Sequence, residues 1–271
     1  MVIDGNGLHA YVADDSTNSI TLFEVNPVSG TLGTSMQTIA SGGTTPSALH
    51  LHPNGQYLYV AHENSNDIGL FNIDPLDGTL TDSGSVVTSS GTAVTHILLT
   101  DDGLHAYIAN QGSANIEAFD INASGVLAST GTVAAGGAVE HLAIDPTGSW
   151  LYAVNADAPG SISAFAIQAG GSLSAINCST GPLCTVGGTP ESIAVDPSGQ
   201  FLAVTNRDDD TIDRFTINQT DGSLSSQQTL TARDQPNAIA YLEDTSAVSI
   251  TPRFAYVAHE FSNSVTSFSI N

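Results

Sequence analysis

One short apolar pattern recurs six times along this chain of 271 residues. It consists of an Ile or Val, two residues, a Phe, one residue and a second Ile or Val. Consecutive copies lie 46 to 53 residues apart, and no helical periodicity separates them. A strand-rich repeat of about this length is typical of a β-propeller. The six copies are centred on Phe23, Phe71, Phe119, Phe165, Phe215 and Phe268.

The spacing within the pattern indicates how each sheet is packed. Residues two positions apart share one face of a strand, whereas residues three positions apart lie on opposite faces. In the second copy, Phe71 and Ile73 therefore share a face, and Ile68 lies on the other. Because both faces are apolar, each sheet is expected to be covered on both sides by neighbouring sheets.

Each repeat resolves into four short strands, of which the innermost comes first and is followed by a tight Gly-containing turn. We predict an all-β fold, a single β-propeller domain over residues 1–271 built from four-stranded antiparallel blades. The predicted repeats span approximately 1–41, 42–89, 90–134, 135–186, 187–231 and 232–271. One Tyr recurs in the second strand of the repeats and is predicted to be a packing residue: Tyr11, Tyr59, Tyr107, Tyr152 and Tyr256.

The first and last repeats are shorter than the others. Residues 1–7 align with the second half of an inner strand and its turn, and residues after Phe268 provide no outer strand. We expect either a six-bladed ring or part of a seven-bladed ring, completed by flanking sequence. The unpaired outer edge of the last repeat is a candidate surface for self-assembly, because exposed edges accept further strands.

The charge balance narrows the range of partners. The chain has 27 acidic residues against four arginines and no lysine, which gives a net charge of −23. Nucleic acids and anionic membrane surfaces require basic patches, so neither is expected to bind. No segment is apolar for long enough to insert into a membrane. An unidentified protein or small molecule remains the expected partner.

Two cysteines and three sequons favour an extracellular, periplasmic or cell-surface protein. Cys178 and Cys184 are separated by five residues that include Gly-Pro, and we predict a disulfide formed in an oxidising compartment. Two thiols in a cytosolic protein are the alternative. Asn122, Asn177 and Asn218 each begin an Asn-x-Ser/Thr triplet, so all three permit glycosylation.

The stretch Thr45-Pro46-Ser47-Ala48-Leu49-His50-Leu51-His52-Pro53-Asn54-Gly55-Gln56-Tyr57-Leu58-Tyr59-Val60-Ala61-His62-Glu63 resembles the lactonase-type β-propeller family. That family is seven-bladed and includes phosphogluconolactonases. The repeat is also similar to the Tyr-Val-Thr-Asn propeller repeats of surface-layer proteins, as at Tyr107-Ile108-Ala109-Asn110. The resemblance covers essentially the whole chain. It indicates the fold more strongly than the activity.

The resemblance also implies a motif, Pro-Arg-His on an inner strand and Asn-Glu after the second strand. No repeat has the arginine, and the equivalent residues are Ser47, Thr95, Glu140, Glu191 and Asn237. The histidine is present as His96 and His141. After the second strand, Glu63 and Glu260 match the Glu, preceded by His62 and His259, and Arg207 occupies the same column.

These columns are expected to meet at one end of the blades and form a site. A His beside carboxylates could act as a general base toward a lactone carbonyl, or the cluster could bind a divalent cation such as calcium. We predict no resident cofactor. The alternative is that these polar side chains only face solvent. The predicted catalytic residues are His96, His141, Glu140 and Glu191. The predicted ligand-binding residues are His62, Glu63, Arg207, His259 and Glu260.

Two functions remain on this evidence. The first is a secreted or cell-surface binding or assembly module, favoured by the absence of lysine, the expected disulfide and the missing arginine of the motif. The second is a lactone hydrolase similar to phosphogluconolactonases. A phosphorylated lactone is disfavoured as its substrate, because a dianion would approach a protein of charge −23.

Overall fold

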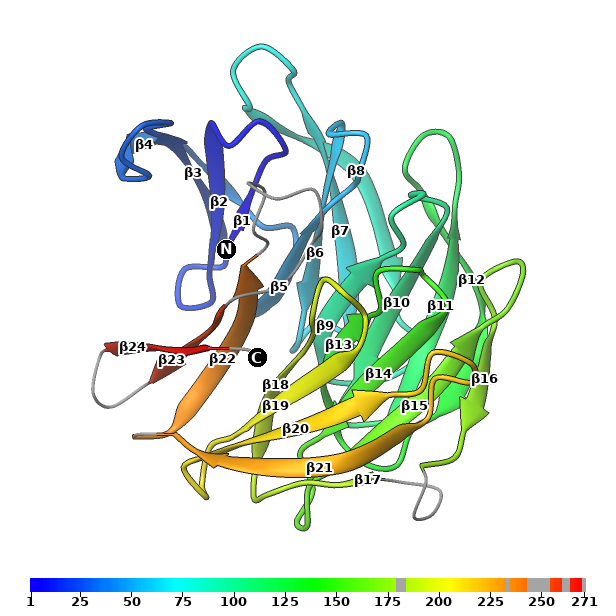
Figure 1. Cartoon of the computed structure of the whole chain (residues 1–271). Helices are drawn as coiled ribbons and strands as arrows, with labels where there is room; N and C mark the ends of the chain where they lie inside the picture. Colours follow the sequence, from blue (N-terminus) through cyan, green and yellow to red (C-terminus); the bar gives the residue numbers. More distant parts are fainter. Residues whose placement is uncertain (179–183, 233, 243–253, 260–263, 270–271) are drawn as a thin grey trace. The chain divides into compact units, whose positions relative to one another are not determined.

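The computed structural model confirms the all-β prediction (Figure 1). It describes residues 1–178, 184–232, 234–242, 254–259 and 264–269, and these contain strands and turns but no helix. His259 is therefore described only in its backbone, and Glu260 lies outside the described residues.

The strands form antiparallel sheets that correspond to propeller blades, in which sequence neighbours pair. The chain divides into two compact units, Met1–Thr132 and Val133–Asn271, and each is described by itself. A single domain over 1–271 remains a prediction.

The first unit contains three four-stranded sheets. Blade 1 consists of β1 (Val2–Ile3), β2 (His9–Asp14), β3 (Ser19–Val25) and β4 (Leu32–Ala40). Blade 2 consists of β5 (Pro46–Leu51), β6 (Tyr57–His62), β7 (Asp67–Ile73) and β8 (Leu80–Thr88). Blade 3 consists of β9 (Val94–Leu99), β10 (His105–Asn110), β11 (Asn115–Ile121) and β12 (Leu127–Ala134).

The second unit contains the other sheets. Blade 4 consists of β13 (Val139–Ile144), β14 (Trp150–Asn155), β15 (Ser161–Ile167) and β16 (Leu173–Ile176), and the short β17 (Cys184–Thr185) pairs with β15. Blade 5 consists of β18 (Pro190–Val195), β19 (Phe201–Asn206), β20 (Thr211–Ile217) and β21 (Leu224–Thr231). Blade 6, as described, consists of β22 (Pro236–Leu242), β23 (Phe254–His259) and β24 (Ser264–Ser269).

The recurring Phe pattern is buried on both faces in blades 2 to 5, as its spacing predicted. Phe71 and Ile68 are each 1% exposed although they lie on opposite faces of β7. They belong to different apolar clusters, Ile68 with blade 3 residues such as Phe119, and Phe71 with blade 1 residues such as Tyr11. Within the first unit, blade 2 is therefore packed between its two sequence neighbours.

The recurring Tyr residues also connect neighbouring blades. Tyr11, Tyr59 and Tyr152 are fully buried, and each hydroxyl donates a hydrogen bond to the backbone carbonyl of a Gly in the following blade. For Tyr59 the acceptor is Gly125, at 2.7 Å. Gly125 has φ of +76°, and a Cβ there would lie 2.9 Å from the ring of Tyr57. Gly125 is thus required by both backbone conformation and close packing.

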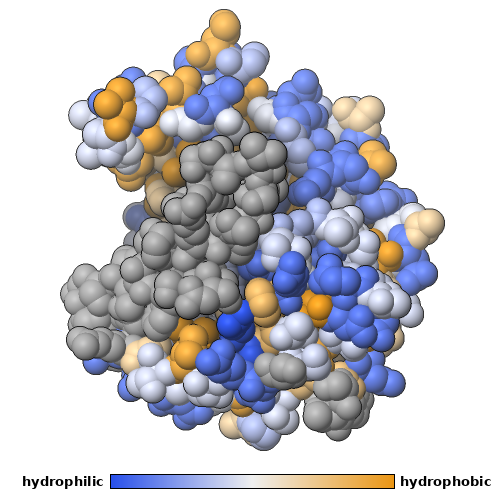
Figure 2. Space-filling view, viewed as in Figure 1, coloured by the Kyte–Doolittle hydropathy of each residue, from blue (hydrophilic) through white to orange (hydrophobic). Residues whose placement is uncertain are grey.

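Surface hydrophobic residues are concentrated in the first unit. Figure 2 shows a largely hydrophilic surface with hydrophobic residues gathered over β3 and β4, at the upper left of the view. Among the residues that the structure describes, the exposed large hydrophobic side chains are Met1, Ile3, Leu8, Val28, Leu32, Met36, Leu76, Val86 and Leu104.

Candidate functional site

A β-bulge opens the first strand of five blades. In blade 5, Pro190 pairs with Asn206 and Ser192 pairs with Thr205, so Glu191 is the extra residue. A bulge re-aims a side chain and ends regular pairing, and bulges are frequent next to binding sites. The extra residue is the position where the resemblance implied arginine: Ser47, Thr95, Glu140, Glu191 and Asn237.

A backbone hydrogen bond holds the residue after the second strand close to the start of the first strand. In blade 5 the N–H of Arg207 donates to the carbonyl of Thr189 at 3.0 Å, and in blade 2 the N–H of Glu63 donates to Thr45 at 2.9 Å. Thr45 and Thr189 have φ of +56° and +47°, in the left-handed region. This turn places both columns of candidate residues at the same end of each blade.

Blade 5 brings one residue of each column into direct contact. The guanidinium Nη1 of Arg207 lies 3.1 Å from the carboxylate Oε1 of Glu191, and its Nε donates to the side-chain oxygen of Gln235 at 3.2 Å. The side chains of Arg207 and Glu191 are 35% and 24% exposed. The ion pair is therefore partly buried and still reachable by a ligand.

Gln235 was missed by sequence reasoning. It precedes the first strand of blade 6, and its backbone N–H donates to the Asp210 carboxylate at 2.8 Å. Its φ of +56° matches the left-handed turn residues of other blades. The signal that could have found it is its position directly before Pro236, which is the position of Thr45 and Thr189 in their repeats.

Glu140 and His141 lie on the strand next to Glu191. Within the second unit, β13 packs beside β18, and both strands carry a bulge carboxylate. Burial lowers the pKa of His141 to about 4, although a ring N–H that donates to the Ile193 carbonyl opposes this effect. His141 is therefore neutral at neutral pH, and its ring is fixed between the two strands.

The first unit places His96 and Thr95 on β9 and Ser47 on the adjacent β5. His96 is partly buried, and the Ser47 hydroxyl donates to the carbonyl of Val94 at 2.7 Å. Glu63 follows β6 and is also partly buried. These first-unit residues occupy the same blade positions as Glu140, His141, Glu191 and Arg207 in the second unit. Among the described residues of the first unit, however, no carboxylate–guanidinium pair is found.

His62 is directed into its blade. Its side chain is fully buried, and its Nδ1 lies 2.7 Å from the Asp67 carboxylate. The same position in blades 3 and 5 holds Asn110 and Asn206, whose amides donate to Asn115 and Thr211 five residues later. The His62–Asp67 pair thus joins the two ends of the loop between the second and third strands. This contact gives His62 a structural role.

The acidic run Asp208-Asp209-Asp210 is used by backbone and side-chain hydrogen bonds. Asp208 accepts from the Thr189 hydroxyl at 2.6 Å, Asp209 from the Gly188 N–H at 2.6 Å, and Asp210 from Gln235. No group of three or more His, Cys, Asp or Glu with metal-binding geometry occurs in the described part of the chain.

The two cysteines are at disulfide distance. Their Cα atoms are 5.5 Å apart, within the usual range for a disulfide. The three sequon residues Asn122, Asn177 and Asn218 are exposed, and their glycosylation stays a prediction. Across the residues that the structure covers, no helix has the length and apolar character needed to cross a membrane.

Comparison with protein families identifies the chain. The family model for the lactonase, 7-bladed β-propeller, matches residues 1–96, 104–187 and 160–241. These segments include most of the sequence, and the chain belongs to this lactonase family. The resemblance stated from the sequence is therefore confirmed. A comparison with curated proteins found no match.

Three solved structures are similar to this chain. A putative 6-phosphogluconolactonase from Bacteroides fragilis is 25% identical, with a TM-score of 0.77 over 87% of this chain and 71% of that one. A putative 6-phosphogluconolactonase from Bacteroides uniformis is 19% identical, with a TM-score of 0.83 over 100% and 80%. The periplasmic gluconolactonase of Pseudomonas aeruginosa is 16% identical, with a TM-score of 0.80 over 99% and 80%. The latter two show the fold alone.

Proposed function

We propose that this protein hydrolyses an uncharged lactone at the end of the second unit where the bulge residues lie. The observation that carries the proposal is the partly exposed Glu191–Arg207 ion pair, with Gln235 as a further partner of the guanidinium. Membership of the lactonase family and the similarity to the Bacteroides fragilis protein support the same reaction class.

Arg207 is the group that would polarise the lactone carbonyl. Hydrogen bonds from a fixed guanidinium stabilise the negative charge that develops on the carbonyl oxygen when water attacks. Glu191 and Gln235 hold the guanidinium from two sides, which limits its rotamers without covering it. A positioned donor of this kind requires little reorganisation during the reaction.

Glu140 is the proposed general base. It occupies the bulge on β13, next to the bulge of Glu191 on β18. The carboxylate accepts a proton from water as the oxygen attacks the carbonyl carbon, and it returns the proton to the ring oxygen when the acyl–oxygen bond breaks. The product is a hydroxy acid, whose carboxyl group then ionises and releases the second proton of the water to solvent. His141 is neutral, so it adds no positive charge that would make the Glu140 carboxylate a weaker base.

The charge of the site favours an uncharged substrate. Glu191 pairs with Arg207, the acidic run 208–210 follows Arg207 directly, and Glu140 lies on the strand next to Glu191. The whole chain has a net charge of −23. A phosphorylated lactone would approach against this field, whereas a neutral lactone would not.

The cysteine pair supports an oxidising location for this activity. Disulfides persist in oxidising compartments outside the cytosol, whereas in the cytosol Cys178 and Cys184 would be kept as reduced thiols. We therefore propose a periplasmic, extracellular or cell-surface enzyme. The binding or assembly module expected first from the sequence has less support than the hydrolase, because the family and the Bacteroides fragilis structure point to lactone chemistry.

The test is hydrolysis of neutral and phosphorylated lactones followed in a pH-stat. Glucono-1,5-lactone and a γ-lactone are the neutral probes, and 6-phosphogluconolactone is the charged one. We expect turnover of a neutral probe that falls at least 100-fold in Glu140→Gln and in Arg207→Met. The matched control is Glu24→Gln, an exposed carboxylate on β3, which should keep the wild-type rate. Folded wild-type protein without turnover above the spontaneous rate would reject the proposal.

A further inference from the structure

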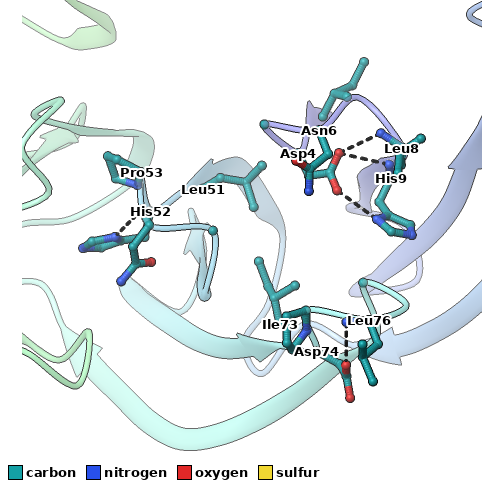
Figure 3. Close-up of a pocket in the computed structure, with 16 residues that line it drawn as sticks. Asp4, Asn6, Leu8, His9, Leu51, His52, Pro53, Ile73, Asp74 and Leu76 are labelled. Carbon is teal, nitrogen blue, oxygen red and sulfur yellow. Dashed lines mark hydrogen bonds and ion pairs between the residues drawn. The ribbon is translucent and has the colours of Figure 1, made fainter. Parts of the chain in front are cut away.

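A cavity lies at the opposite end of blades 1 and 2 from the bulge residues. It has a volume of about 580 Å³ and is lined by the turns 4–8, 52–55 and 74–78 together with strand residues Leu51 and Ile73. Figure 3 shows Leu51 and Ile73 between Asp4 and His9 on one side and His52 and Pro53 on the other. All of these residues belong to the first unit.

The cavity has a specific cause in the sequence of the first turn. In blades 3 and 5, the turn glycine is contacted by a turn residue of the preceding blade. A Cβ on Gly103 would lie 2.5 Å from the His52 ring, and a Cβ on Gly199 would lie 3.5 Å from Pro146. A Cβ on Gly55 would meet no atom within 4 Å.

In blade 1, the turn residues equivalent to those that contact the next blade elsewhere are either small or directed toward their own turn. Its turn reads Asp4-Gly5-Asn6-Gly7, so Gly5 takes the place of Pro53 and Pro146 in the equivalent turns. The Asp4 carboxylate is directed to its own turn, where it accepts from the N–H groups of Leu8 and His9 and contacts the His9 ring at 2.8 Å. The space that His52 and Pro146 occupy against the turn glycines of blades 3 and 5 is left open here.

We propose that this cavity binds a monosaccharide-sized, uncharged ring that bears hydroxyl groups. Its volume is in the range of small-molecule sites, which combine an apolar floor with a few polar groups. Leu51 and Ile73 provide the floor, on which one face of a sugar ring can lie. Asn6 and Asn54 line the walls, and their side-chain amides provide hydrogen-bonding groups for hydroxyls. His52 adds a ring face to the wall, because its two nitrogens already pair with the Gly103 carbonyl and the Asn54 N–H.

The carboxylates of the cavity argue against an anionic ligand. The Asp4 carboxylate takes part in three hydrogen bonds, and the Asp74 carboxylate accepts from the Leu76 N–H. An anion would be repelled by both groups.

The test uses methyl α-D-glucopyranoside, methyl α-D-galactopyranoside and methyl α-L-rhamnopyranoside, which contain no lactone. Binding to the whole protein is measured by titration calorimetry and by saturation-transfer NMR. We expect saturable binding of at least one glycoside. Gly5→Trp should weaken it at least tenfold, because the indole fills the cavity. Gly5 has no neighbour within 4 Å and no left-handed φ, so the variant should fold, as a wild-type unfolding midpoint would verify.

The matched control is Asp101→Trp. Asp101 is the exposed equivalent of Gly5 in the turn of blade 3, outside the cavity lining, and its replacement should leave binding unchanged. Asn6→Ala, which removes a wall amide without filling space, should weaken binding about threefold. Failure of all three glycosides to bind, or equal binding by Gly5→Trp, would overturn the inference. This test does not measure lactone turnover. The sugar-binding inference would therefore remain valid if the hydrolase proposal were rejected.

Discussion

His141 should make the folded protein less stable as the pH falls from 7 to 5. Burial lowers its pKa from the ordinary value of 6.5 to about 4. The unfolded chain therefore takes up a proton below pH 6.5, whereas the folded protein does so only near pH 4. Between these values protonation favours the unfolded state, so the free energy of unfolding decreases as the pH falls.

The size of this effect follows from the two pKa values. At pH 5 the difference in proton binding costs the folded state about 2 kcal/mol, and at pH 7 it costs only about 0.2 kcal/mol. The assay is urea unfolding of wild type and His141→Gln at both pH values. We expect wild type to lose about 2 kcal/mol more than the variant between pH 7 and pH 5. Lowered absolute stability of the variant does not affect this comparison.

An equal pH dependence in the two proteins would refute the argument, because it would mean that the His141 ring gains or keeps its proton equally in both states. His50 provides an independent repetition. Burial and the nearby His52 lower its pKa to about 4 as well. His50→Gln should therefore reduce the loss between pH 7 and pH 5 by a similar amount, and the two effects should add, since they lie in different units.

Three further changes test the packing between and within blades. Tyr59→Phe leaves the buried Gly125 carbonyl without its hydroxyl donor and should lower the free energy of unfolding by about 1–2 kcal/mol in urea titrations. Gly43→Ala would place a Cβ 2.5 Å from the His62 ring, and we expect a loss of about 1–3 kcal/mol by the same assay. Cys178→Ser removes the disulfide and should cost about 2 kcal/mol, a difference that disappears when both proteins are measured with reductant.

The blades could be predicted from the sequence because their packing requires apolar side chains at regularly spaced positions. Phe71 and Ile68 recur with fixed spacing, and the structure buries both. The Tyr column was predicted as packing, but its hydrogen bonds to the next blade were not, since the partner Gly125 lies 66 residues away in sequence. Periodicity reports which face a residue occupies, and it does not report which distant atom that residue meets.

The candidate site was harder to predict, because it depends on backbone irregularity. A bulge at Glu191 changes the strand register by one residue, and no side-chain pattern in Pro190-Glu191-Ser192 indicates it. The burial of His62 was missed for a related reason. Only alignment of the repeats shows that it replaces the loop-closing Asn110 and Asn206, which is a packing position.

In the Glu191–Arg207 pair, an ion pair is retained at two family positions while the acidic and the basic residue are exchanged. The resemblance implies arginine on the first strand and glutamate after the second, and this chain has them in the opposite order. Attraction between the two charges is the same in either order, so the bulge and the turn can remain joined. What differs is the group on the first strand, where Glu140 and Glu191 now place carboxylates on adjacent strands. A site in which acids replace the cation there should prefer neutral esters to phosphorylated ones, because repulsion of the dianion then acts at the position where attraction is implied for the family.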